Sequence, residues 1–164
     1  MERKSQNTTL CYIEKDGCVL MMHRIKKKND ENKDKWIGIG GHFEPFESPE
    51  DCILREAQEE TGLTLTDLRY RGIVTFVCEG WPEAEYMHLF QSTAYTGEPK
   101  ECDEGDLQWI PRQRLYELPM WEGDKIFLDL LATDEPFFSL KLVYEGLEEA
   151  THLSGAWLNG RRIR

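Results

Sequence analysis

The sequence predicts an α/β protein in which a mixed β-sheet is sandwiched between α-helices. Apolar runs of strand length recur along the chain, and segments 49–61 and 123–132 carry the apolar spacing of helices. Strands interleaved with two well-marked helices are typical of a sheet flanked by helical layers. The chain has 164 residues, of which 40% are hydrophobic, and this size fits one domain around one core.

The first elements are predicted to form a β-hairpin. The apolar runs TTLCYI (8–13) and CVLMM (18–22) are separated by EKDG, in which Asp16-Gly17 is a favourable turn pair. A polar loop, KKKNDENKDK (26–35), follows the second run. The segment WIGIGGHF (36–43) is then predicted to be a strand interrupted by glycines.

Residues 48–62 carry the strongest helix signals in the chain. Ser48 can cap the N-terminus, Pro49 suits the first helical position, and two acidic residues follow at the positive end of the helix dipole. Gly62 stands where a helix of this length ends. The arc predicted to face the core holds Ile53, Leu54 and Ala57.

The second half of the chain is predicted to add strands around one more helix. The strands are RGIVTFV (71–77), EYMHLFQSTAY (85–95), LQWI (107–110) and FFSLKLVY (137–144). The helix, 123–132, has one apolar face formed by Ile126, Phe127, Leu130 and Leu131. The 145–164 tail is ambiguous, because EGLEEATHL fits a helix while the basic GRRIR fits a mobile end.

Composition excludes several classes of function. A formal net charge of -11 disfavours binding to nucleic-acid polymers, although it leaves room for a phosphorylated small molecule carrying a cation. No apolar run reaches the length of about 18 residues that a membrane span needs. The polar N-terminus lacks the apolar segment of a signal peptide, so we expect a cytoplasmic location. Five cysteines without a CxxC pair indicate reduced thiols.

Three acids crowd the 49–61 segment. Glu56, Glu59 and Glu60 are separated by three and four positions, so we expect them to project from one side of the helix. Like charges at this spacing cost roughly 0.2–0.5 kcal/mol per pair. One interpretation is a solvated acidic face. The other is a site for a hard divalent cation, Mg²⁺ or Mn²⁺, which prefers oxygen ligands.

The segment before this helix supports the second interpretation. Gly40-Gly41 allow the backbone to bend closely beside the helix and to offer a carbonyl oxygen. Glu47 lies in the entering loop within reach of Arg55. Such a pair would fix the loop against the helix, whereas an ordinary surface pair would contribute roughly 0–1 kcal/mol.

Together these residues match a known motif. Gly41, Glu47 with five residues between them, and REAQEETGL (55–63) after seven intervening residues fill every defining position of the Nudix box, with Ala57 small for its apolar position. The chain is identified by this resemblance as a member of the Nudix hydrolase family. The resemblance implies the Nudix fold across a single domain at 1–164, with the box at 41–63 and 145–164 as a C-terminal extension.

The resemblance also implies a chemistry and its residues. Nudix hydrolases cleave a nucleoside diphosphate linked to another group, using Mg²⁺ or Mn²⁺. The cation neutralises the negative charge of the diphosphate. Catalytic roles are implied for Glu47, Arg55, Glu56, Glu59 and Glu60. The implied metal ligands are Glu56, Glu59 and Glu60 with the carbonyl of Gly40. The general base would be a box glutamate or an acid from a distant loop.

The resemblance extends beyond the box through KWIGIGGHFE, RGIVTF, ECDEGDLQWIP, LPMWEGDKIFLDLL and EPFFSLKLVYEG. With these motifs, residues 8–146 resemble bacterial 8-oxo-dGTP diphosphatases of the MutT type. This implies that Glu104 completes the metal site and that Arg24 binds phosphate, the alternatives being a solvated loop acid and a surface arginine. Further positions implied to contact the substrate are Thr9, Trp36, Ile37, Trp121 and Asp124. The position of Ile37 is an asparagine that reads the base in the mammalian enzyme, and isoleucine makes no side-chain hydrogen bond, so purine recognition must differ here.

The sequence thus predicts Mg²⁺-dependent conversion of a nucleoside triphosphate, such as 8-oxo-dGTP, to the monophosphate and pyrophosphate. The alternatives are hydrolysis of ADP-ribose or a nucleotide sugar, and a nucleotide sensor without turnover. Residues 30–41 do not form an EF-hand, because Lys35 and Gly41 stand where such a loop has glycine and glutamate. The four histidines lack the HExxH spacing of zinc peptidases. The sequence does not indicate the oligomeric state.

Overall fold

The protein was analysed as a computed structural model that describes residues 5–26 and 28–164. Residues 1–4 of the polar N-terminus and residue 27 of the predicted 26–35 loop lie outside the described residues. The elements are β1 (Gln6–Lys15), β2 (Cys18–His23), β3 (Trp36–Ile37), α1 (Pro49–Thr61), β4 (Thr64–Leu65), β5 (Arg69–Cys78), β6 (Glu85–Ser92), β7 (Tyr95–Thr96), β8 (Asp106–Pro111), η1 (Arg112–Glu117), α2 (Glu122–Leu131), β9 (Phe138–Glu145), η2 (Glu148–Ala150), β10 (His152–Leu158) and β11 (Arg161–Arg162).

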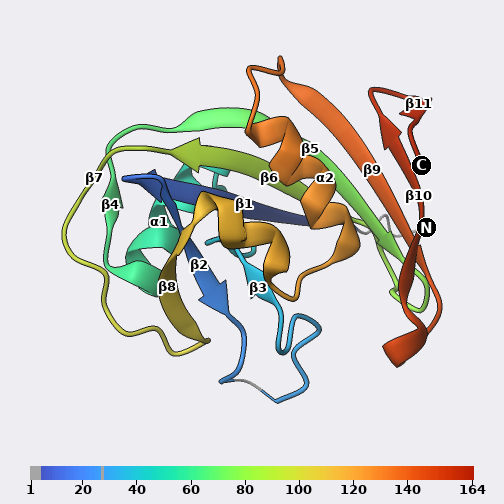
Figure 1. Cartoon of the computed structure of the whole chain (residues 1–164), viewed down its shortest axis with the longest axis horizontal. Coiled ribbons are helices and arrows are strands. Elements are labelled where there is room, and N and C mark those ends of the chain that lie inside the picture. Colours follow the sequence, from blue (N-terminus) through green and yellow to red (C-terminus); the bar gives the residue numbers. More distant parts are fainter. Residues whose placement is uncertain (1–4, 27) are drawn as a thin grey trace.

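The predicted mixed sheet is confirmed. Nine strands form one sheet in the order β11-β10-β9-β5-β6-β1-β2-β3, with β8 also paired to β2, while β4 and β7 form a separate small sheet. The pairs β1–β6 and β5–β9 are parallel, and the other pairs in the large sheet are antiparallel. Figure 1 shows this sheet crossing the molecule with α2 in front of it.

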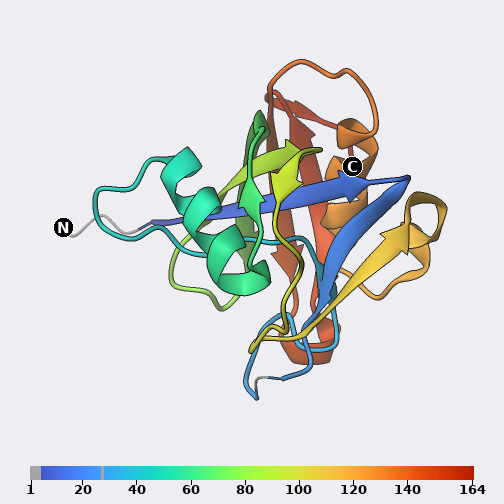
Figure 2. The same ribbon diagram turned by 90° about the vertical axis from the view of Figure 1, so that its left-hand side faces the viewer.

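The two helices cover opposite faces of the sheet, as the turned view shows (Figure 2). One buried cluster includes Phe127 of α2 together with Leu140 and Leu142 of β9. The other cluster includes Ile53 and Ala57 of α1. Successive side chains of a strand point to opposite faces, and β1, β2 and β6 accordingly contribute to both clusters.

The first hairpin forms as its sequence predicts. β1 pairs antiparallel with β2 in a register that places Ile13 opposite Leu20. Asp16 and Gly17 have φ angles of 52° and 76° at the turn. Two consecutive positive φ values are the requirement of a tight two-residue hairpin turn, and Asp-Gly meets it at low cost.

Helix α1 also begins and ends where the sequence indicates. The Ser48 side chain accepts a hydrogen bond from the Asp51 amide while the Asp51 carboxylate accepts one from Ser48, and Gly62 closes the helix with a φ of 77°. The core-facing arc was predicted wrongly at one position. Leu54 is 39% exposed, whereas Ile53 and Ala57, four residues apart, are fully buried.

Two predicted strands are shorter than expected. The 36–43 strand is reduced to Trp36–Ile37, followed by single bridges that pair Ile39 with Cys11 and His42 with Thr8. The glycine-rich stretch runs too close to β1 for a regular ladder, since a Cβ on Gly40 would lie 1.8 Å from the Thr9 carbonyl oxygen. The 85–95 strand divides into β6 and β7.

The tail is a β-structure, so the helical interpretation of EGLEEATHL was wrong except for the three residues of η2. β10 pairs with β9, and β11 folds back onto β10, which also corrects the interpretation of GRRIR as a mobile end. Burial of Leu153 and Ala156 against the core drives this pairing. All five cysteines are free, as predicted.

Candidate functional site

The predicted site residues surround a cavity of about 400 Å³. It lies beside the first half of β1, between the N-terminal half of the box and the start of α2. Its walls come from segments far apart in the sequence. They include Thr8, Thr9, Arg24, Asp30, Glu31, Asn32, Ile37, Gly40, Gly41, Glu56, Glu60, Trp81, Glu85, Glu104, Trp121 and Asp124.

One end of the cavity is acidic. Glu56 and Glu60 reach it from α1, and Glu104 reaches it from the loop before β8. The Gly40 amide donates to Glu60 Oε2 over 3.3 Å. A Cβ on Gly41 would lie 2.5–2.7 Å from the Glu56 carboxylate, so this carboxylate packs directly against the glycine backbone. Gly41 therefore allows the Glu56 carboxylate to approach the loop, and Gly40 allows the loop to approach β1.

The acidic end is poorly solvated and electrostatically strained. Glu60 is 7% exposed. Burial, together with the nearby carboxylates of Glu104 and Glu56, raises the pKa of Glu60 to about 9. Burial also raises the pKa of Glu56, against the opposing effect of Arg55. A cation that replaces the missing hydration would relieve this repulsion.

Arg55 clamps the box. It donates to both carboxylate oxygens of Glu47, over 2.8 and 2.9 Å, and to the His42 carbonyl over 3.0 Å. The same guanidinium contacts Glu56 at 2.8 Å and Glu59 at 3.2 Å. Its hydrogen bonds lower the pKa of Glu47 to about 2. The predicted Glu47–Arg55 pair is thus present and is bidentate, a geometry that fixes both partners.

The three box acids fall within an arc of about 100° on α1, as expected, but they differ in burial. Glu60 falls on the buried stripe with Ile53 and Ala57, at helical spacing from both. Glu59 lies about 100° away around the helix, and its side chain is 58% exposed. Glu59 therefore contacts Arg55 and does not line the cavity.

The donors at the acidic end fit a hard divalent cation. Among residues 5–26 and 28–164, no group of three or more His, Cys, Asp or Glu side chains is already arranged to hold a metal. Arg55 accounts for part of this, because it binds the Glu56 carboxylate. The carboxylates of Glu56, Glu60 and Glu104 are nevertheless close enough to shift one another's pKa, and their oxygens are the ligands that Mg²⁺ and Mn²⁺ prefer.

Two further predicted residues brace this end. Arg24 pairs with Asp30 at 2.7 Å and with Glu104 at 2.9 Å, so its charge already has two carboxylate partners. Thr9 is buried, with its hydroxyl 3.3 Å from Cys52 Sγ and 3.4 Å from the Gly41 carbonyl. Both residues line the cavity while holding its walls in place.

The other end of the cavity is aromatic and carries a single buried acid. Asp124 is 5% exposed. Burial raises the pKa of Asp124 to about 8, with Lys35 opposing the shift and Glu85 adding to it. Trp121 donates from Nε1 to Asn32 Oδ1 over 2.6 Å, which fixes its ring as a wall of the cavity. A flat apolar body with a polar edge suits this end.

Trp36 is not brought to the cavity. It is 9% exposed, stacks on His23 with 4.5 Å between ring centroids, and belongs to the core cluster. Its neighbour Ile37 does line the cavity. Sequence reasoning missed Glu85, which the parallel pairing of β6 with β1 places opposite Gln6. No local signal marks such a residue, because the pairing is long-range.

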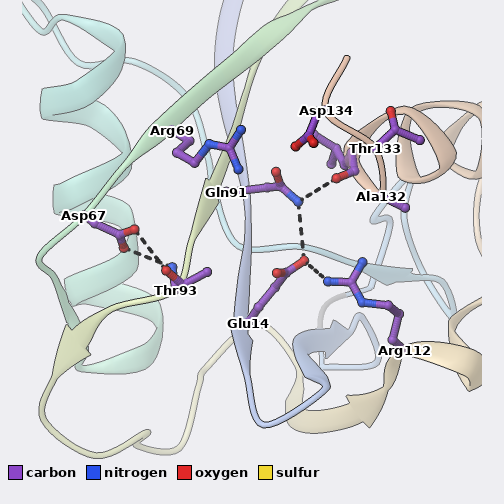
Figure 3. Close-up of a pocket in the computed structure, with 10 residues that line it drawn as sticks. Glu14, Asp67, Arg69, Gln91, Thr93, Arg112, Ala132, Thr133 and Asp134 are labelled. Carbon is purple, nitrogen blue, oxygen red and sulfur yellow. Dashed lines mark hydrogen bonds and ion pairs between the residues drawn. The ribbon is translucent and has the colours of Figure 1, made fainter. Parts of the chain in front are cut away.

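A second cavity, of about 390 Å³, lies at the opposite end of β1 (Figure 3). Several of its polar groups satisfy one another. Gln91 donates to Glu14 over 3.3 Å and to the Leu131 carbonyl over 3.1 Å, and Glu14 also pairs with Arg112. These contacts tie the end of α2 to the sheet, so this cavity is explained by the fold.

Comparisons with known proteins agree with this geometry. Residues 4–131 match the NUDIX domain family. The chain is 32% identical to an oxidized purine nucleoside triphosphate hydrolase of Danio rerio, with 81% of this chain and 83% of the relative covered. It is also 32% identical to the Nudix hydrolase YvcI of Bacillus subtilis, covering 77% of this chain and 78% of the relative.

The fold has a solved counterpart. A mutator MutT protein from Bacillus halodurans superposes with a TM-score of 0.81 at 26% identity, covering 94% of this chain and 97% of that one. No helix among the described residues is long and apolar enough to cross a membrane. The intact box, the cavity that it lines and the domain match lead to one assignment. The chain belongs to the Nudix hydrolase family.

Proposed function

We propose that this Nudix hydrolase converts an oxidised purine nucleoside triphosphate, of which 8-oxo-dGTP is the model substrate, to the monophosphate and pyrophosphate. One observation carries the proposal: the cavity joins an acidic end, formed by Glu56, Glu60 and Glu104, to an aromatic end at Trp121 and Asp124. A diphosphate with its cation suits the first end and a purine suits the second. The relatives named oxidized purine nucleoside triphosphate hydrolases support this choice.

Mg²⁺, or Mn²⁺ in its place, would be held by Glu56, Glu60 and Glu104, with the Gly40 carbonyl as a further donor. When bound, it supplies the positive charge that neutralises the diphosphate oxygens and activates water. Glu56 or Glu104 would accept the proton of the attacking water. Arg55 contributes by holding Glu47 and the entering loop, which keeps the carboxylates positioned.

The purine would lie against Trp121, with the apolar side chain of Ile37 lining the same cavity. Asp124 is largely protonated at neutral pH because of its raised pKa, so it would donate a hydrogen bond to an acceptor on the base. Oxidation of guanine changes the donors and acceptors of its five-membered ring. A buried carboxylic acid discriminates between guanine and 8-oxoguanine if it can pair with only one of the two hydrogen-bonding patterns. With the other base, a buried donor or acceptor is left unpaired.

The partner is a small nucleotide and not a nucleic-acid polymer, because a net charge of -11 opposes a polyanionic backbone. Free nucleotides and five unpaired cysteines favour a cytoplasmic location. Relatives named NAD-capped RNA hydrolases match about half of the chain, 49% for one from Pseudomonas fluorescens, which keeps dinucleotide substrates among the alternatives. We place nucleotide sugars, ADP-ribose and a non-catalytic sensor role behind the triphosphate.

The test compares Glu56→Gln and Glu104→Gln with the wild type in Mg²⁺ and 8-oxo-dGTP. Loss of turnover by at least about tenfold in both, with unchanged thermal unfolding, supports the proposed metal site. Glu117→Gln is a matched control, since Glu117 is exposed and, among residues 5–26 and 28–164, has Arg114 as its one ion-pair partner. Wild-type turnover in the two cavity variants would overturn the assignment. Nucleotide binding without pyrophosphate release by the wild type would identify a sensor.

A further inference from the structure

A third cavity, of about 570 Å³, opens directly beside the nucleotide cavity. The two share Glu31, Trp81 and Trp121 in their walls. It lies between the β5–β6 turn, the start of α2 and the η2 segment, so part of it belongs to the C-terminal region beyond residue 131. We call it the rear chamber; its lining residues include Glu31, Lys35, Glu79, Trp81, Trp121, Glu122, Tyr144, Leu147, Glu148 and Glu149.

Aromatic rings form the inner wall of the rear chamber and hold one another in place. These rings are Trp81, Trp121 and Tyr144. The Phe76 ring, which lines the nucleotide cavity, contacts all three, with centroid distances of 5.2 Å to Trp81, 5.3 Å to Trp121 and 4.8 Å to Tyr144. Trp121 and Tyr144 meet edge to face at 5.1 Å. The Tyr144 hydroxyl accepts from the Gly123 amide at 2.7 Å, which adds a polar anchor. These contacts hold the rings of the wall in fixed positions relative to one another.

The mouth of the rear chamber is acidic. Five glutamates line it against a single lysine. Glu122 pairs with Arg164, and Glu79 accepts from the Gly146 amide. The other three, Glu31, Glu148 and Glu149, make no ion pair within the described part of the chain. An electron-rich aromatic wall with an acidic mouth attracts cations and repels phosphate.

The chain itself places an ammonium group in the rear chamber. Lys35 Nζ lies 4.5 Å from the centroid of the Trp121 ring. Among the described residues it has no carboxylate within ion-pair distance, so this cation is held by a ring face. Tryptophan is the aromatic side chain that binds ammonium groups best. Lys35 therefore shows which chemistry the wall accepts.

We propose that the rear chamber is a binding site for an alkylammonium group, which displaces the Lys35 ammonium from Trp121. The ligand is either a substituent on the base of the bound nucleotide, reaching past Trp81, or a free organic amine. Its positive charge would face the Trp121 ring while the glutamates at the mouth offset its lost hydration. The proposal rests on the proposed function only if the ammonium group is a substituent on the nucleotide, because a free amine binds without any nucleotide.

Choline is the probe, and its uncharged isostere 3,3-dimethylbutan-1-ol is the matched control. Both are titrated calorimetrically into the wild type and Lys35→Met at constant ionic strength, without nucleotide or metal. We expect choline to bind Lys35→Met at least about tenfold more tightly than the isostere, and more tightly than it binds the wild type. Equal affinity for choline and the isostere, or no binding of either to Lys35→Met, would overturn the proposal.

A double variant, Glu148→Gln with Glu149→Gln, separates the rear chamber from hydrolysis. These residues do not line the nucleotide cavity, so triphosphate turnover should not change. Choline affinity in the Lys35→Met background should fall several-fold, and unchanged affinity would count against the acidic mouth. If the wild type did not hydrolyse a triphosphate, the proposed function would be rejected, but choline binding at the rear chamber would still support the ammonium site.

A second experiment distinguishes the two sources of the ammonium group, a substituent on the nucleotide base and a free organic amine. The KM of an aminohexyl-substituted ATP is compared with that of its N-acetylated, uncharged form. A lower KM for the charged form, with competition by choline, assigns the ammonium to the substrate. Equal KM values with choline still bound assign the rear chamber to a free amine. Both outcomes uphold the site, and tighter binding of the acetylated form would contradict it.

Discussion

The two adjacent glycines Gly40 and Gly41 should respond in opposite ways to substitution by alanine. Neither adopts a positive φ, so the cost of a methyl group is steric at both positions. At Gly40 a Cβ would lie 1.8 Å from the Thr9 carbonyl oxygen and 2.9 Å from Leu10 Cα. Backbone cannot yield by a side-chain rotation, so Gly40→Ala should reduce the free energy of unfolding by at least about 3 kcal/mol.

At Gly41 the three atoms nearest to the added methyl group all belong to the Glu56 carboxylate, whose carbon would be 2.5 Å away. Ordinary contact begins near 3.4 Å, so the carboxylate must move by roughly 0.9 Å. Glu56 can move because it is the end of a side chain, although Arg55 restrains it at 2.8 Å. The free energy of unfolding of Gly41→Ala should therefore stay within about 1 kcal/mol of the wild-type value. Its turnover should fall by up to ~10²-fold, because misplacing a catalytic group such as the Glu56 carboxylate by about 1 Å costs that much.

Urea unfolding measures the first effect, and Mg²⁺-dependent pyrophosphate release measures the second. The pair acts as its own control because the two methyl groups are equal in size and adjacent in sequence. A Gly40→Ala protein as stable as the wild type would refute the close approach of this loop to β1. A Gly41→Ala protein with full turnover would refute the placement of Glu56 at the reacting centre.

Three other changes test the buried charges. Arg71 is 4% exposed and donates to the Thr133 and Leu131 carbonyls at the end of α2. Arg71→Met should therefore lower the free energy of unfolding by about 3 kcal/mol in urea, and unchanged stability would contradict this role. Glu60, with a pKa raised to about 9, must release its proton when a metal binds. The Mg²⁺ affinity measured by calorimetry should therefore rise by up to about tenfold per pH unit from pH 7 to pH 9. An affinity that does not change with pH would contradict the role of Glu60 as a metal ligand. Asp124, with a pKa raised to about 8, is protonated below that pH and ionised above it. The KM of the wild type should therefore increase above pH 8, whereas the KM of Asp124→Asn should stay level. The same pH dependence of KM in both proteins would exclude Asp124 as the hydrogen-bond donor.

Local signals predicted the parts of the fold that depend on neighbouring residues. The Asp16-Gly17 turn and the Ser48 and Gly62 caps formed as predicted, because each satisfies a backbone requirement within a few positions. The tail was misjudged for the opposite reason. Leu153 and Ala156 become strand residues only because β9 offers them a partner, which no property of the tail itself reveals.

The site divides in the same way. The box spacing predicted the Glu47–Arg55 pair, because seven residues connect them through a loop and about two helical turns. Spacing alone could not show that Glu60 is buried while Glu59 is exposed, since this depends on which side of α1 meets the sheet. Glu85 was also out of reach, because it enters the cavity through a parallel pairing between distant strands.

The most direct test of the central claim is a comparison of kcat/KM across substrates with product identification. The panel holds 8-oxo-dGTP, dGTP, ADP-ribose, a nucleotide sugar and NAD, each with Mg²⁺ and with the metal chelated. We predict metal-dependent release of pyrophosphate and the monophosphate, with kcat/KM highest for 8-oxo-dGTP. A higher kcat/KM for ADP-ribose, the nucleotide sugar or NAD, or turnover that survives chelation, would contradict the account.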